Sequence, residues 1–170
     1  WIKQVLRRRK RIYLTSFSFP LEKLSQTSIF FPGFEINQLL FELEDWYNNQ
    51  PYAFYEFFNI GGKETNYTLK LIAEYQGDAG DVMSKLGGMK FSTKDADHDH
   101  NDGNCAEEVG GGLWYKDCTD AVFTKRPYPI EDLRSTRKVK GFFWNHTEHN
   151  LLYKKVTMMV RPRPKPEIWF

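Results

Sequence analysis

Long apolar runs are absent from this chain of 170 residues. No stretch approaches the roughly 20 apolar residues that a membrane-spanning helix needs, and no basic-then-apolar signal segment opens the sequence. We therefore expect no membrane insertion. Because the first residue is Trp1 rather than methionine, we expect a fragment or a partial translation, in which a missing signal says little about destination.

Cysteine is scarce as well, with Cys105 and Cys118 the only two. Two cysteines do not define a redox compartment by themselves. They occur together with two Asn-x-Thr sequons, which begin at Asn66 and Asn145 and are candidate glycosylation sites. An even number of cysteines combined with sequons favours an oxidising setting, so we expect a secreted, extracellular protein.

Neither sign of charge dominates, because 24 Lys and Arg residues face 22 Asp and Glu residues for a net charge of +2. The charges are nevertheless segregated into a basic cluster at residues 7–11 and an acidic region at residues 95–120. Clustered Lys and Arg can contact nucleic acid, anionic lipid or glycosaminoglycan, be cleaved by a processing protease, or simply form a solvated arm. No aromatic-interleaved RNA motif or recognition helix accompanies them, so we expect no nucleic-acid partner.

The hydrophobic fraction of 41% and the aromatic fraction of 16% argue against disorder and predict one globular unit with a real core. Residues 39–44 alternate apolar and polar side chains, residues 52–58 are rich in aromatics, and residues 67–75 alternate again. Turn-forming residues separate the three segments, which predicts an antiparallel meander. Asp78 is placed to cap a short helix over residues 79–86.

An acidic stretch within residues 88–118 is the most informative part of the sequence. Asp95, Asp97 and Asp99 alternate with other residues, and carboxylates that close repel one another unless a cation or solvent screens them. Gly103 lets the backbone turn beside them, where carbonyl oxygens can complete a shell of oxygen ligands. Ca²⁺ is the leading candidate, and a solvated loop is the alternative.

Two other metal sites fit the spacing less well. Counted from Asp97, an EF-hand would have suitable residues at its third, fifth and twelfth positions, but Asp102 stands where that loop requires glycine, and no amphipathic helix precedes it. His98 and His100, two residues apart among carboxylates, lack the Cys/His spacing of a structural zinc site.

The run FSTKDADHDHNDGNCAEE, followed by Gly-Gly-Leu-Trp-Tyr and a second cysteine, resembles the C-terminal fibrinogen-like module of fibrinogen chains, ficolins, tachylectins, angiopoietins and tenascins. The resemblance implies a disulfide between Cys105 and Cys118. It also implies a calcium site formed by the side chains of Asp97 and Asp99 and by the backbone carbonyls of Asn101 and Gly103.

The resemblance implies an α+β fold: an antiparallel sheet with short helices and a long, loop-rich subdomain that binds calcium and ligand, here truncated. It covers residues 39–162 and ends in the segment KGFFWNHTEHNLLYKKVTMMVRP. Residues 1–38 hold the basic cluster and a possible strand at residues 12–19, and they stay unassigned. Residues 163–170 form a Pro-rich tail.

In lectin-like members of this family the ligand pocket lies beside the second cysteine, which implies a site at Asp117, Cys118 and Thr119. The peptide bond before that cysteine is cis in those members, and here it would join Asp117 to Cys118. The chain departs from the family at Thr119, where histidine is common, and at Leu113 and Thr147, where tryptophan is common. Some of the recognition surface is therefore expected to differ.

The predicted function is a secreted, calcium-dependent recognition module that binds acetylated carbohydrate as a lectin in innate recognition. The alternatives are a module that binds a cell-surface receptor or matrix protein, and a truncated paralogue without binding activity. No serine or cysteine has the context of a catalytic nucleophile, so we expect no enzyme. Family members often gain valency from an upstream stalk, so the full-length protein is expected to be oligomeric.

Overall fold

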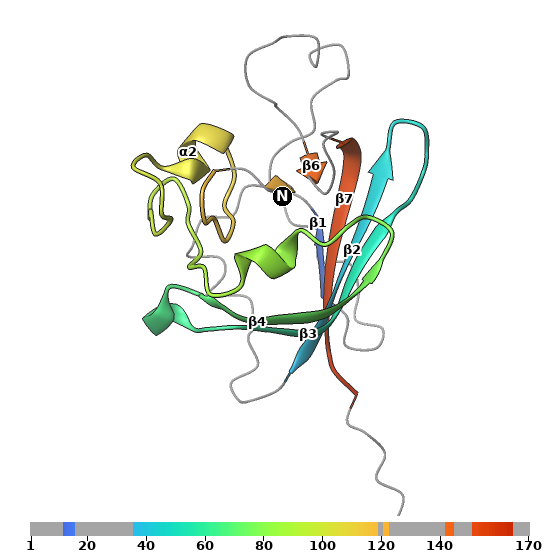
Figure 1. Cartoon of the computed structure of the whole chain (residues 1–170), viewed down its shortest axis with the longest axis horizontal. Helices are drawn as coiled ribbons and strands as arrows, with labels where there is room; N and C mark the ends of the chain where they lie inside the picture. Colours follow the sequence, from blue (N-terminus) through green and yellow to red (C-terminus); the bar gives the residue numbers. More distant parts are fainter. Residues whose placement is uncertain (1–11, 16–35, 119–120, 123–141, 145–150, 165–170) are drawn as a thin grey trace, which may run out of the picture.

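The computed structural model describes residues 12–15, 36–118, 121–122, 142–144 and 151–164. These residues fold around one antiparallel sheet of seven strands in the order β4-β3-β2-β7-β6-β5, with β1 also paired to β7 (Figure 1). The strands are β1 (Ile12–Thr15), β2 (Asn37–Asp45), β3 (Tyr52–Ile60), β4 (Leu69–Gly77), β5 (Ala121–Val122), β6 (Phe142–Trp144) and β7 (Leu151–Pro162).

The predicted meander is confirmed as β2, β3 and β4, each antiparallel to the next. Leu39, Phe41 and Leu43 point to one face of β2 and are at most 1% exposed, whereas Glu42 between them is exposed. Alternating side chains place every second residue on the same face of a strand. The apolar positions of β2 therefore fix which face of the sheet carries the core.

Strand β7 lies between β2 and β1, since Thr157 pairs with Glu42 on one edge and with Thr15 on the other. The sheet contacts continue beyond the boundary predicted at residue 162. Arg163 donates its backbone N–H to the carbonyl of Ile36 over 2.9 Å, and its guanidinium lies 2.8 Å from Glu56. The first residue of the predicted tail is thus bound to β3 and to the chain just before β2.

Helices are few in the described residues: η1 (Lys63–Thr65), η2 (Met83–Leu86) and α2 (Cys105–Val109). The helix predicted over residues 79–86 is wrong in extent, because only the short 3₁₀ helix η2 forms. Asp78 does not cap it. Its carboxylate instead accepts the backbone N–H of Tyr52, over 2.8 Å and 26 residues away in sequence.

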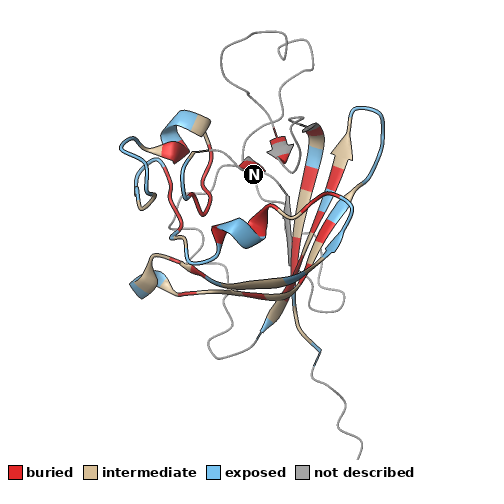
Figure 2. Cartoon of the chain, in the orientation of Figure 1, coloured by how far each residue is buried: buried red, intermediate tan, exposed pale blue. Residues whose placement is uncertain are grey.

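The core lies between the sheet and a loop-rich layer that includes η2 and α2, and the buried residues follow that boundary in Figure 2. Trp144 of β6 is 1% exposed, packs against Phe41 with ring centroids 4.9 Å apart, and donates its indole N–H to the carbonyl of Gly80. This contact joins β2, β6 and the chain before η2.

The acidic stretch belongs to that loop-rich layer and is anchored at its base. Ser92 and Leu113 exchange two backbone hydrogen bonds, of 2.9 and 3.1 Å. The indole N–H of Trp114 donates to the carbonyl of Tyr67 over 2.7 Å. The residues between Ser92 and Leu113 form a loop that this pairing closes. The candidate site lies on that loop.

Candidate functional site

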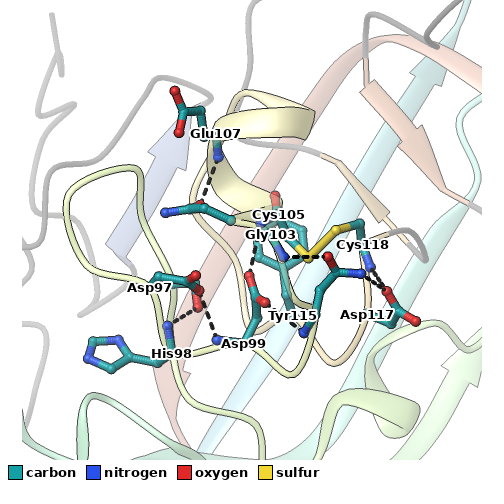
Figure 3. Close-up of a disulfide and its surroundings, with 12 residues drawn as sticks. Asp97, His98, Asp99, Gly103, Cys105, Glu107, Tyr115, Asp117 and Cys118 are labelled. Carbon is teal, nitrogen blue, oxygen red and sulfur yellow. Dashed lines mark hydrogen bonds between the residues drawn. A yellow bond between two sulfur atoms is a disulfide. The ribbon is translucent and has the colours of Figure 1, made fainter.

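In the acidic loop, residues 95–103, the side chains of Asp97, Asp99 and Asn101 each accept the backbone N–H two residues later (Figure 3). Asp97 accepts the N–H of Asp99 over 3.2 Å, Asp99 accepts that of Asn101 over 2.9 Å, and Asn101 accepts that of Gly103 over 2.9 Å. Short Asp and Asn side chains favour such turns because their oxygen reaches the backbone two residues on. From Asp97 to Gly103 the alternation seen in the sequence is thus a repeated local hydrogen bond, whereas the carboxylate of Asp95 accepts the hydroxyl of Thr93 over 2.6 Å.

The end of the loop is tied to a disulfide. The second carboxylate oxygen of Asp99 accepts the N–H of Cys105 over 3.0 Å, and Cys105 is bonded to Cys118, as the resemblance implies. Asn104 caps the short helix α2, because its side-chain oxygen accepts the N–H of Glu107 over 2.9 Å. The loop, the helix and the disulfide form one connected unit.

Asp117 joins this unit from the other side. Its carboxylate accepts hydrogen bonds from the side-chain amide of Asn101, at 2.8 Å, and from the N–H of Cys118, at 2.9 Å. The bond from Asn101 and then the bond from Cys118 lower the pKa of Asp117, because both stabilise its charged form. Asp117 is therefore directed at the loop as an ionised acceptor.

The oxygen atoms that the resemblance assigns to calcium are suitable in kind. Asp97, Asn101 and Gly103 are exposed, and Asp99 is partly exposed. No other described residue donates a hydrogen bond to the carbonyl oxygens of Asn101 and Gly103. Carboxylate and carbonyl oxygens are the hard ligands that Ca²⁺ takes. These residues fit a calcium ion in donor type and accessibility.

The described residues contain no group of three His, Cys, Asp or Glu side chains that are all free to bind one metal ion. The group found there with His, Cys, Asp or Glu ligand atoms within 4.8 Å of one another is Cys105, Asp117 and Cys118, and its sulfurs are joined in the disulfide. His98 holds its Nδ1 atom 2.9 Å from the carbonyl oxygen of Phe91. A calcium ion at the loop would depend on backbone carbonyls in addition to Asp97 and Asp99.

The cis peptide bond expected between Asp117 and Cys118 is wrong, because the described residues contain no cis peptide bond. In the trans form the N–H of Cys118 reaches the carboxylate of Asp117, and a non-proline cis bond costs about 3 kcal/mol. Thr119, Asn145 and Thr147 lie outside the described residues. Of the predicted pocket, only Asp117 and Cys118 can be placed, and they lie side by side next to the loop.

The aromatic pair beside the disulfide is structural. Trp114 and Tyr115 are 5% and 2% exposed, and burial raises the pKa of Tyr115, whose hydroxyl donates to the carbonyl of Gly111 over 2.7 Å. Leu113, where the family often has tryptophan, is 2% exposed and paired with Ser92. The position where Leu113 replaces the tryptophan common in the family therefore lies in the core and not on the exposed surface of a pocket.

The face of the sheet that points away from the core carries a groove, which was not predicted from the sequence. It has a volume of about 460 Å³ and is lined by side chains of β2, β3 and β7, including Leu40, Phe54, Met159 and Arg161. Asp117 and Cys118 do not line it. The signal in the sequence was Leu40, an apolar residue on the otherwise polar face of β2.

Comparison with known proteins shows which family the chain belongs to. A family model described as fibrinogen beta and gamma chains, C-terminal globular domain, matches residues 15–163. The chain belongs to this family. The matched range of this fibrinogen-like chain begins at the last residue of β1, well before Leu39.

Among curated relatives, Fibrinogen C domain-containing protein 1 of Xenopus tropicalis is 43% identical over 131 residues, which are 74% of this chain and 28% of the relative. Angiopoietin-related protein 2 of Mus musculus is 36% identical over 128 residues, which are 75% of this chain and 26% of the relative. The fibrinogen-like chain thus spans about a quarter of the length of these relatives.

Solved structures show the same fold. The fibrinogen-like globe domain of human ANGPTL2 has a TM-score of 0.67 at 32% identity, over 76% of this chain and 60% of that one. The lamprey fibrin D-dimer, solved with the peptide ligand Gly-His-Arg-Pro-amide, has a TM-score of 0.66 at 27% identity, over 79% of this chain and 48% of that one. The fibrinogen-like fold with its antiparallel sheet is therefore established for this chain.

Proposed function

We propose that this fibrinogen-like chain is an extracellular recognition module whose partner is a protein, either a cell-surface receptor or a matrix component. The observation that carries the proposal is its shared family and fold with the lamprey fibrin D-dimer, which was solved with a bound peptide. The relatedness to angiopoietin-related protein 2 points to the same class of module. This reading fits the comparisons better than the lectin that the sequence predicted first.

The geometry beside Cys118 also favours a protein partner over an acetylated sugar. The carboxylate of Asp117 is already engaged by Asn101 and by its own neighbour. What remains is an exposed, polar loop surface, which suits a protein interface rim better than a closed sugar pocket.

We assign to this surface six exposed residues, four from the end of the acidic loop and two from the segment just before Cys118. They are His100, Asn101, Asp102, Gly103, Lys116 and Asp117. Together with exposed Asp97, Glu107 and Glu108 they give the surface a net negative charge. Electrostatic complementarity therefore favours a partner that presents basic side chains, with binding that weakens as salt rises.

Ca²⁺ is proposed as a structural ion at this surface. Asp97, Asp99 and the carbonyls of Asn101 and Gly103 would hold it, and its charge would offset the repulsion between the carboxylates. The hydrogen bond from Cys105 to Asp99 connects that set to the disulfide. Ordering the loop in this way would present the same surface to every partner molecule.

The extracellular setting rests on the disulfide between Cys105 and Cys118 and on the two sequons. Disulfides persist in oxidising compartments and are rare in the cytosol. Within the described part of the chain, the helices are too short and too polar for any of them to traverse a bilayer.

The test measures capture of immobilised receptor and matrix ectodomains by the purified chain, with Ca²⁺ or with EDTA, and with free N-acetylglucosamine as competitor. We expect capture that requires Ca²⁺ and is insensitive to the free sugar. Asp102→Lys reverses a charge on the proposed surface and should weaken capture at least about tenfold. Glu64→Lys makes the same change on η1 and should leave capture unchanged.

Calcium-dependent retention on an acetylated resin, abolished by the free sugar, would instead establish the lectin. Equal effects of Asp102→Lys and Glu64→Lys would remove the loop from the binding surface. A chain that folds cooperatively and binds neither probe would be the truncated paralogue without activity.

A further inference from the structure

One of the two sequons, Asn66-Tyr67-Thr68, lies in a described turn between η1 and β4. Asn66 ends η1 in the left-handed conformation, with φ 50° and ψ 42°. Its backbone is fully used: the N–H donates to the carbonyl of Lys63 over 3.0 Å, and the carbonyl accepts the N–H of Phe91 over 3.0 Å. Its side-chain amide is partly exposed and forms no hydrogen bond with another described residue.

The other two sequon residues are committed to the fold. Tyr67 is 5% exposed, its N–H donates to the carbonyl of Gly62, and its carbonyl accepts the indole N–H of Trp114. The hydroxyl of Thr68 donates to the carbonyl of Thr65 over 2.6 Å. Of the three sequon side chains, the amide of Asn66 is thus the accessible group without a partner in the described structure.

The neighbours of the turn are exposed as well. Figure 1 places η1 at the free end of the β3–β4 ribbon, apart from β2 and β7. Lys63 and Glu64 beside Asn66 are exposed, and so is Lys90 next to Phe91. Because the side chain of Asn66 is itself partly exposed, a large polar group on its amide can extend into solvent at this end.

We propose that Asn66 carries an N-linked glycan in the mature protein. A lipid-pyrophosphate-linked oligosaccharide in the secretory pathway would be the donor. The side-chain nitrogen of Asn66 forms a bond to the anomeric carbon of the first sugar, the carbon–oxygen bond to the lipid pyrophosphate breaks, and one amide proton is lost as the lipid pyrophosphate leaves. Asn-x-Thr is the acceptor sequence for this transfer.

The competing explanation for asparagine here is conformational. Asn and Asp adopt the left-handed region several times more often than other non-glycine residues, so Asn66 could be present only to end η1. Two substitutions distinguish the glycosylation explanation from the conformational one. Asn66→Asp keeps the backbone preference and removes the acceptor, whereas Thr68→Ser changes the side chain and keeps the sequon.

The experiment expresses the full chain behind a secretion leader in animal cells and recovers it from the medium. After peptide N-glycosidase in heavy-oxygen water, trypsin releases residues 64–70, which contain Asn66, and residues 141–154, which contain Asn145. We expect Asn66 to be converted to labelled aspartate in most molecules of the wild type and of Thr68→Ser. Thr68→Ala and Asn66→Asp should each migrate one glycan faster on a gel.

Recovery of residues 64–70 with unlabelled Asn66 from folded, secreted wild-type chain would overturn the proposal and leave the conformational explanation. Asn66→Asp guards against a folding artefact, because it preserves the turn. The inference depends on the proposed extracellular setting but not on the proposed partner. A glycan without ectodomain capture would refute the binding function alone, and capture without a glycan would refute this inference alone.

Discussion

The carboxylate of Asp99 accepts the backbone N–H of Cys105 over 3.0 Å, so one residue connects the acidic loop to the disulfide. The other oxygen of the same carboxylate accepts the N–H of Asn101. Asp99 therefore holds the turn inside the loop and the start of α2 at once. A change in the charge of Asp99, or in the groups that bind its carboxylate, should therefore affect both the turn inside the loop and the start of α2.

Calcium should stabilise the chain, and the effect should depend on Asp99. At free calcium near 100 times its Kd, a ligand that binds only the folded state adds about 2.7 kcal/mol to the free energy of unfolding. For a chain of this size that raises Tm by about 5–10 °C. Asp99→Asn removes one ligand charge and should lose most of the increase, measured by thermal melts in Ca²⁺ and in EDTA.

Asp102→Asn is the matched control for that experiment. Asp102 is an exposed carboxylate of the same loop and forms no side-chain hydrogen bond or ion pair with another described residue. It should keep the response to calcium. Wild-type midpoints that are indistinguishable in Ca²⁺ and EDTA at low ionic strength would contradict the calcium site.

The strands were predictable because their signal is local. Leu39, Phe41 and Leu43 alternate with polar residues, and this period of two decides both the strand and its buried face. The acidic loop was recognisable for a similar reason, since its alternating aspartates form a local pattern in which Asp97 and Asp99 each accept an N–H two residues later.

Features that depend on distant contacts were not predictable. Asp78 looked like a helix cap, yet its carboxylate is taken by Tyr52, which only the folded sheet brings near. The burial of Leu113 against Ser92 depends in the same way on the packing of residues 91–118. The groove combines three strands, so Leu40 in β2 is only one part of its signal in the sequence.

Removing the disulfide should destabilise the chain and weaken calcium binding together. Cys105 and Cys118 are 13 residues apart, and opening a loop of this order costs about 3 kcal/mol. The double change Cys105→Ala with Cys118→Ala should lower the free energy of unfolding by that amount in urea titrations. Combined with Asp99→Asn, the losses should be smaller than additive, because both act on the same contact. Strict additivity would contradict the coupling.

Tyr55→Phe should destabilise the packing of η2 on the sheet. The hydroxyl of Tyr55 donates to the carboxylate of Asp81 over 3.0 Å and accepts the N–H of Met83 over 3.2 Å. Leaving those partners unsatisfied costs about 1–3 kcal/mol. Tyr52→Phe is the control on the same strand, since Tyr52 is 44% exposed and its hydroxyl has no hydrogen bond to a described residue. Equal losses from the two changes would show that the hydroxyl of Tyr55 contributes nothing.

Alkaline pH should unfold the chain through its buried tyrosines. Burial raises the pKa of Tyr55 and Tyr115 above the ordinary value of 10.0, so the folded state keeps protons that the unfolded state releases. Their contribution to stability is therefore fully present below pH about 10 and is lost as pH rises beyond it, by about 1.4 kcal/mol per pH unit for each group that stays protonated in the folded state. Urea titrations from pH about 9 to 11.5 should show the decline, and Tyr115→Phe should make it shallower. A free energy of unfolding that is constant or rises across this range would contradict the prediction.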